Sequence, residues 1–234
     1  MDYKTKGTSV VQEIFLGEFW SVTDFAYDEA GTTVTGLSDM GKIKLTIEPN
    51  VVIPSVGPKD EPIIGIGAGV NMKGVFVVAD DAGTTDDTTD DKYYTPESVV
   101  LPSTLKTIGN WAFALNPSLT YETEMSEIIL PDGLETIGQT AFQNSKLTSI
   151  SIPDSVTTMG NGAFTGSANL TDVKLSANVV DIPQSAFAAG TSTTMSLKSL
   201  VIPEGVETDN PTTYTIEDET ITLKDPTKGP DATK

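Results

Sequence analysis

The stretch that decides the fold is Leu147-Thr-Ser-Ile-Ser-Ile-Pro153-Asp-Ser-Val-Thr-Thr-Met-Gly160-Asn-Gly-Ala-Phe164. Its apolar side chains at Ile150 and Ile152 alternate with polar ones, which predicts a β-strand. Pro153 has no N–H to donate to a strand ladder, so the strand ends there. The second half reads apolar-x-x-apolar-Gly-x-x-Ala-Phe, which predicts a bend followed by a short helical turn with the phenylalanine pointing inward.

The same unit recurs along the chain. Two positions identify the copies, the proline that ends the strand and the phenylalanine that ends the unit, and both recur every 22 to 29 residues. Periods in this range indicate stacked supersecondary units, because one unit cannot bury its apolar side alone. Stacking places neighbouring strands about 4.8 Å apart and makes one continuous core. The landmark residues are Pro102, Pro131, Pro153, Ser176 (in the proline position) and Pro203, with Phe113, Phe142, Phe164 and Phe187.

The repeat, written Leu-x-x-Ile-x-Ile-Pro-x-x-Val-x-x-Ile-Gly-x-x-Ala-Phe, closely resembles the BspA-like leucine-rich repeats of bacterial surface proteins. The resemblance covers roughly residues 99–203. It implies a right-handed leucine-rich-repeat solenoid that is mainly β, with short helical turns and a parallel sheet. The family often has Cys three residues after the phenylalanine, whereas this chain has small or polar residues there, which can bond the turn backbone instead. They are Asn116, Ser145, Ser167 and Gly190.

The sequence divides into three regions. Residues 1–48 are expected to form an N-terminal segment and an α/β cap, with a hairpin at 24–35. A helix capped by Ser38 follows, with Met40, Ile43 and Ile47 on one side. Residues 49–206 are expected to form about five coils with an acidic excursion at 74–96. In the first coil residues 69–71 stand in the Ala-Phe position, and the excursion begins with a strand at 75–78. Residues 207–234 are expected to form a hairpin at 212–223 and a linker.

Composition excludes several classes of function. The net charge is −19, and all 14 basic residues are lysines, so neither nucleic acid nor an anionic membrane is an expected partner. The absence of Cys and His excludes thiol nucleophiles, His-based triads and the usual zinc sites. Carboxylates are abundant, but no motif selects a facing pair of the kind that glycosidases need. We therefore expect a protein that is not an enzyme.

Nothing in the sequence predicts membrane insertion, because no run of 18 apolar residues occurs. Residues 1–20 lack the basic start and apolar core of a signal peptide. The resemblance implies an extracellular location on a bacterial cell surface, so we expect a signal peptide that has been trimmed from this chain.

The candidate binding residues are the outward side chains in the middle of the repeat strands. Because strand side chains alternate between faces, these residues point away from the core and form a column across the sheet. An exposed run of apolar residues there would suit a partner, although the excursion or the cap could equally cover it. Trp111, in the variable position before Ala112, is a further candidate. The column consists of Val52, Val100, Ile129, Ser151, Lys174 and Val201.

The acidic loop within the excursion has two interpretations. Residues 80–91 carry six aspartates, and calcium prefers carboxylate oxygens. The spacing does not match an EF-hand loop, so a solvated loop without metal is the alternative. If calcium binds, we expect the ligands to be Asp86, Asp87, Asp90 and Asp91; no other cofactor is expected.

Two functions remain open. The first is a non-catalytic protein-binding or adhesion module, expected to be a monomer, that presents the solenoid sheet face to a protein or glycan of the host or extracellular matrix. The adhesive role is implied by the resemblance alone. The second is a structural spacer or stalk segment without a specific ligand. An exposed apolar patch on the sheet face is expected for the binding module, and a uniformly polar surface for the spacer.

Overall fold

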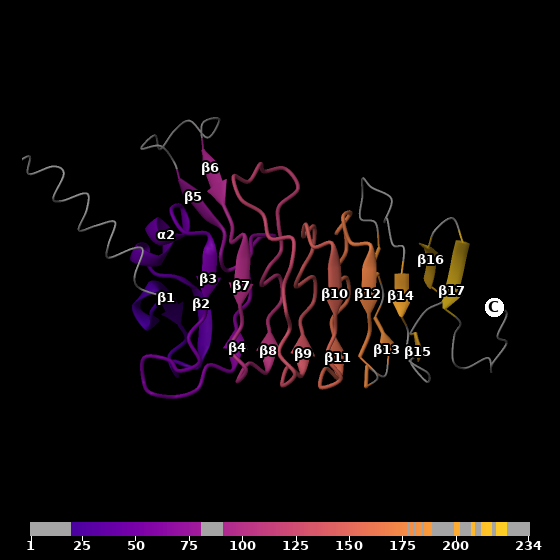
Figure 1. Cartoon of the computed structure of the whole chain (residues 1–234), viewed down its shortest axis with the longest axis horizontal. Coiled ribbons are helices and arrows are strands. Elements are labelled where there is room, and N and C mark those ends of the chain that lie inside the picture. The colour runs from indigo at the N-terminus through magenta and orange to yellow at the C-terminus, as the bar shows by residue number, and fades with distance from the viewer. Residues whose placement is uncertain are drawn as a thin grey trace, which may run out of the picture.

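The computed structural model describes residues 20–80, 91–176, 178–179, 181–183, 185–188, 199–201, 207–208, 212–216 and 219–223. Figure 1 shows an elongated stack of coils that runs from the N-terminal cap to the C-terminal hairpin. The elements of the cap and first coils are η1 (Val22–Asp24), β1 (Phe25–Tyr27), β2 (Thr33–Leu37), α2 (Asp39–Leu45), β3 (Asn50–Val52), β4 (Gly65–Ile66), β5 (Val78–Asp80), β6 (Lys92–Tyr94), β7 (Ser98–Val100) and β8 (Thr107–Ile108). The elements of the later coils are β9 (Thr136–Ile137), β10 (Ser149–Ser151), β11 (Thr158–Met159), β12 (Asp172–Lys174), β13 (Asp181–Ile182), β14 (Ser199–Val201), β15 (Glu207–Thr208), β16 (Thr212–Ile216) and β17 (Glu219–Leu223).

The predicted parallel stacking of the coils is confirmed, but each coil contributes to two rows of strands rather than to one sheet. The first row contains the strands before the prolines, with β3 paired to β7 and β10 paired through β12 to β14. The second row contains two-residue strands that end just before the Gly position, β4, β8, β9 and β11. The hairpin β1–β2 extends this second row, because β2 pairs in parallel with β4.

Stacked phenylalanines form the centre of the core. Phe113, Phe142, Phe164 and Phe187 are all buried, and successive ring centroids lie 5.1–5.3 Å apart. Phe76 adds a fifth ring, 5.5 Å from Phe113. The spacing of the rings follows that of the strands, so every coil contributes one ring to the same column.

The identity of Phe76 corrects two predictions for the first coil. Residues 69–71 do not take the Ala-Phe position: Val70 is 67% exposed, and the buried ring comes from Phe76. The N–H of Val75 donates to the carbonyl of Ala112, as the N–H of Phe113 does to that of Ala141. The strand predicted at 75–78 is also wrong, because residues 74–77 form the turn that buries Phe76 and strand β5 begins only at Val78.

The serines in the family's usual cysteine positions bond the turns, as expected. Ser145 and Ser167 are buried, and their hydroxyl oxygens lie 2.9 Å apart. Ser167 also donates to the carbonyl of Phe142 at 2.9 Å. Both hydroxyls are therefore satisfied inside the core, which burial would otherwise penalise.

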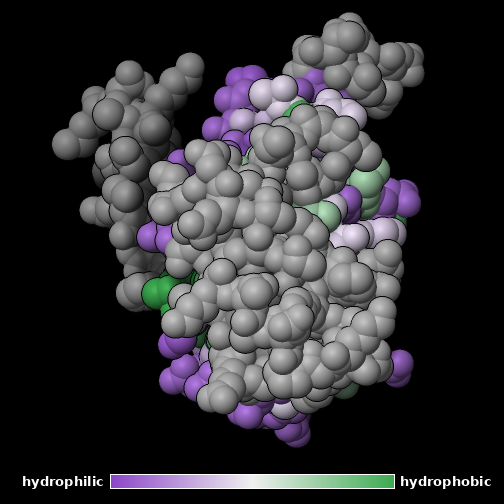
Figure 2. All heavy atoms as spheres, turned by 90° about the vertical axis from the view of Figure 1, so that its right-hand side faces the viewer, coloured by the Kyte–Doolittle hydropathy of each residue, from purple (hydrophilic) through white to green (hydrophobic). Residues whose placement is uncertain are grey.

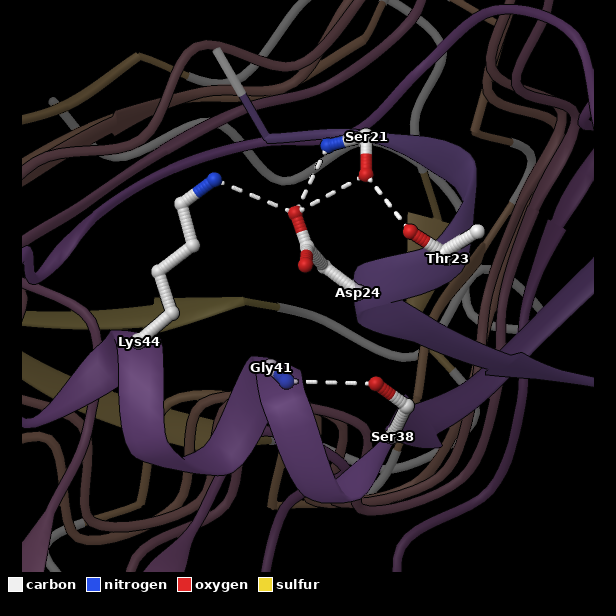
Figure 3. A network of polar contacts seen from close by, with 6 residues as sticks. All are labelled: Ser21, Thr23, Asp24, Ser38, Gly41 and Lys44. Atoms are coloured by element: carbon white, nitrogen blue, oxygen red, sulfur yellow. Dashed lines mark hydrogen bonds and ion pairs between the residues drawn. The ribbon is translucent and has the colours of Figure 1, made fainter. Parts of the chain in front are cut away.

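The N-terminal cap forms as predicted, with one difference. Ser38 caps α2 by accepting the N–H of Gly41 at 3.1 Å (Figure 3). However, Met40 and Ile43 lie on the exposed side of the helix and Ile47 is exposed just after its end at Leu45, whereas Lys44 and Leu45 are buried.

Lys44 is buried because it has a charged partner. Its ammonium lies 3.1 Å from a carboxylate oxygen of Asp24, which also accepts the N–H and hydroxyl of Ser21 (Figure 3). The same ammonium lies 5.1 Å from the centre of the Trp20 ring. Apolar periodicity could not predict this arrangement, because the ion pair turns the lysine toward the core.

Two hairpins project from the coil stack. The excursion forms the antiparallel pair β5–β6, and Figure 1 shows it extending from the stack beside α2. The antiparallel pair β16–β17 contains residues 212–216 and 219–223, within the range where a hairpin was predicted. The region boundaries after residues 48 and 206 remain predictions.

Candidate binding surface

Five of the six residues of the predicted outward column lie on parallel strands, two in the β3–β7 pair and three in the β10–β12–β14 sheet, whereas Ile129 lies on no strand. Val52 is directly opposite Val100 in the β3–β7 pair, and Lys174 pairs with both Ser151 and Val201 across β10, β12 and β14. Val100 is 56% exposed, and Ser151 and Lys174 are also exposed. Val52 is half-buried, and for Val201 the structure describes only the backbone.

Ile129 belongs to a segment that separates the two groups of strands. Residues 126–130 lie between β7 and β10 but form no strand ladder with either. Ile128 and Leu130 point into the core, whereas the side chain of Ile129 is 86% exposed. Thr148, just before β10, donates its N–H to the carbonyl of Ser126 at 3.0 Å, which fixes the start of the segment.

A groove lies on each side of this segment. The groove toward β7 has a volume of about 490 Å³ and is lined mostly by apolar atoms, with Val100 and Ile129 among its walls. The groove toward β10 has a volume of about 500 Å³ and a more polar lining, which includes Ser149 and Ser151. The strand face is therefore a ridge at Ile129 between two hollows.

Most of the charged side chains that line the two grooves are acidic. Glu127 and Asp132 line each groove, and neither makes an ion pair with any residue that the structure describes. Asp154 and Lys174 line only the groove toward β10, and Lys174 is the one basic residue among its described lining residues. Seen from the C-terminal end, the visible part of the described surface is mainly hydrophilic (Figure 2).

Trp111 lies apart from the column. It occupies the turn after β8, in the second row of strands, with its side chain half-buried. Its N–H donates to the carbonyl of Gln139 at 3.0 Å, and its φ angle is +55°. The structure thus places Trp111 at the bend of its coil, where it cannot share one contact area with Val100 and Ile129 on the first row.

Only one of the four predicted calcium ligands lies among the described residues. Asp91 accepts a hydrogen bond from the hydroxyl of Tyr93 at 3.3 Å, while Asp86, Asp87 and Asp90 lie outside the described ranges. Burial and the Asp91 carboxylate raise the pKa of Tyr93. Within the described ranges, no group of three or more acidic side chains could hold a metal ion, and calcium binding by the loop stays a prediction.

The grooves were missed by sequence reasoning, although one signal points to them. The coil between Pro102 and Pro131 is 29 residues long, whereas the next coil has 22. The extra residues form the loop before Met125, and residues 126–130, which follow this loop, form no strand ladder with their neighbours. Coil length alone does not predict such a break, because β14 follows a coil of 27 residues and still pairs with β12.

The described part of the chain contains no helix long and apolar enough to cross a membrane. No curated protein sequence matches the chain. Among solved structures, a leucine-rich repeat protein from T. pallidum is 20% identical, with a TM-score of 0.51 over 80% of this chain and 84% of that one. This similarity supports the fold.

Two further solved structures match with lower TM-scores. A leucine-rich repeat protein from Bacteroides ovatus is 19% identical, with a TM-score of 0.40 over 80% of this chain. The pneumococcal vaccine antigen PcpA is 20% identical, with a TM-score of 0.43 over 81% of this chain. The matched regions cover only 54% and 42% of those two proteins.

The repeats also match a family model. The model for the BspA-type leucine-rich repeat region matches residues 92–215 in six copies, which is more than half of the chain. The matched residues contain the first-row strands from β7 onward, the stacked phenylalanines from Phe113 onward, and both grooves. The chain therefore belongs to the BspA-type leucine-rich repeat family.

Proposed function

We propose that this chain is a non-catalytic protein-binding module of a bacterial cell-surface protein, and that it binds through the first row of strands. The observation that carries the proposal is the side chain of Ile129, 86% exposed beside Val100 on an otherwise regular strand face. Exposing a large aliphatic side chain on a rigid ridge is unfavourable in water, and it suits a surface that a partner covers. Membership of a family of bacterial surface proteins supports the extracellular location.

A spacer segment is the competing function. A spacer needs only a solvated surface, and the net charge of −19 would suit it. A spacer function gives no reason for Val100 and Ile129 to be exposed next to two grooves on the same face. The binding function accounts for both features, so we favour a partner that is a protein or glycan of the host or extracellular matrix.

The proposal can be tested with purified extracellular-matrix proteins immobilised for biolayer interferometry. The test variant is Val100→Lys with Ile129→Lys, and the control is Val70→Lys, because Val70 is 67% exposed and outside the first row of strands. We expect at least one matrix protein to bind the unmodified chain and the control equally. We expect the test variant to bind it at least about tenfold more weakly, as for loss of an apolar contact at the centre of an interface.

Two results would contradict the proposal. If no matrix protein binds the unmodified chain, the adhesive function is wrong and the spacer is favoured. If binding occurs but the Val100 and Ile129 variant binds as well as the control, the strand face is not the contact surface. Circular dichroism of both variants checks that the fold is retained.

A further inference from the structure

We propose that the two grooves receive an extended polypeptide segment of the partner in which lysine or arginine side chains flank an apolar side chain. This inference deepens the proposed function and rests on it. Three independent features of the grooves support it: exposed apolar side chains, unpaired peptide groups and unpaired carboxylates.

The apolar features fix the centre of the contact. Val100 and Ile129 line the groove toward β7, and the atoms that line this groove are mostly apolar. A side chain of the partner that enters the groove would contact both residues and remove their surface from water. This burial is worth roughly 25 cal/mol for each Å² of apolar surface.

The peptide groups favour an extended polypeptide as the occupant. The N–H and carbonyl groups of Glu127, Ile128 and Ile129 make no hydrogen bond with any residue that the structure describes. Among the described strands β7 pairs only with β3, so no described strand covers its edge toward the groove. Such edges are often completed by an extended segment of another protein, whose own peptide groups supply the missing partners.

The carboxylates determine the charge of that segment. Glu127 precedes Ile129 and Asp132 follows it, and both line each groove without an ion-pair partner in the described structure. None of the described residues that line the groove toward β7 is a lysine. Cationic side chains on either side of the partner's apolar residue would therefore be attracted, and acidic ones repelled, within a chain whose net charge is −19.

The proposal is tested by fluorescence anisotropy with three labelled peptides: Lys-Val-Thr-Leu-Lys, Lys-Ser-Thr-Ser-Lys and Glu-Val-Thr-Leu-Glu. We expect the first peptide to bind at least about tenfold more tightly than the other two, and its affinity to fall as salt is added. The test variant is Glu127→Lys with Asp132→Lys. The control is Glu29→Lys with Glu61→Lys, two exposed acidic residues away from the grooves that change the net charge equally.

We expect the test variant to lose at least about tenfold in affinity for the first peptide while the control keeps it. An equal loss in both variants would show that net charge alone attracts the peptide, and would overturn the proposal. Similar binding of all three peptides would overturn it as well. If analytical ultracentrifugation shows a dimer that Ile129→Lys dissociates, a second copy of the chain fills the grooves and the proposal is wrong.

Failure of this inference can be separated from failure of the proposed function. If matrix-protein binding depends on Val100 and Ile129 but no peptide binds, the strand face is the binding surface and its preference for basic segments is wrong. If neither matrix proteins nor peptides respond to changes on this face, both proposals fail.

Discussion

One position has a left-handed backbone conformation in each of the four coils that contain Phe113, Phe142, Phe164 and Phe187. It lies two residues after the Gly position of the repeat, and its occupants are Trp111, Thr140, Gly162 and Ser185, with φ angles between +49° and +64°. Glycine adopts this conformation without steric cost, whereas a β-branched residue rarely does. Thr140 has a second disadvantage, because its hydroxyl is buried and has no hydrogen-bond partner in the structure.

We therefore expect Thr140→Gly to raise the free energy of unfolding by about 1 kcal/mol, because the backbone strain and the unpaired hydroxyl are both removed. The reverse change in the next coil, Gly162→Ala, should lower it by about 1 kcal/mol. A Cβ atom at residue 162 would also lie 2.9 Å from the hydroxyl oxygen of Thr165. Urea unfolding followed by circular dichroism measures both changes, and a loss of stability in Thr140→Gly would contradict the account.

The turn between β1 and β2 depends on a single carboxylate. One oxygen of Asp28 accepts the backbone N–H groups of Gly31 at 2.8 Å, Thr32 at 2.9 Å and Thr33 at 3.2 Å. Desolvation acts to raise the pKa of Asp28, but hydrogen bonds from these residues together lower it. Because this hairpin begins the second row of strands, the turn helps to hold β2 in place against β4, the second-row strand of the first coil.

Asp28→Ala should lower the free energy of unfolding at neutral pH by about 1–2 kcal/mol, since three N–H groups lose their charged acceptor. The pKa of Asp28 is lower in the folded state, so its contribution is present above the unfolded value of about 4. It is lost as the pH falls through the folded value. Urea unfolding at pH 6 and at pH 3 should show the difference between the two proteins narrowing at pH 3, and a constant difference would contradict this role.

Elements that depend on a local pattern were predictable, whereas those set by contacts between coils were not. The strands before the prolines and the Ser38 cap follow from alternation and capping chemistry within a few residues. The second row of strands was missed because two residues are too few to show a period of two. The buried face of α2 was missed because it depends on the pairing of Lys44 with Asp24.

The candidate site was predictable only in part, for the same reason. The outward direction of Val100 and Ile129 follows from strand alternation alone. The grooves beside them depend on the distance between neighbouring coils, which the repeat pattern does not contain. Phe76 was also missed, because an insertion in the first coil moves it away from the position where the repeat spacing predicts the phenylalanine.

The column of phenylalanine rings couples the coils along the whole molecule. Phe142 lies between two rings, 5.2 Å from Phe113 and 5.1 Å from Phe164, with interplanar angles of 7° and 1°. Phe76 ends the described column and stacks on Phe113 alone, at 5.5 Å and 30°. In a solenoid each coil contacts only its neighbours, so the rings carry much of the interaction between adjacent coils.

We expect Phe142→Ala to lower the free energy of unfolding by about 3–5 kcal/mol, the usual effect of removing a buried aromatic ring. Phe76→Ala should have a smaller effect, because its cavity opens at one end of the column and only one stacked neighbour is lost. Since neighbouring coils would be coupled only weakly across residue 142, the two sides of the molecule should then unfold separately.

Hydrogen exchange at increasing urea concentration can follow the N–H of Gly109, bonded to Ile66, and that of Ile152, bonded to Lys174. In the unmodified chain both should exchange in one transition, and in Phe142→Ala they should separate. A single shared transition in the variant, or an equal loss of stability for Phe76→Ala, would show that the ring column does not couple the coils.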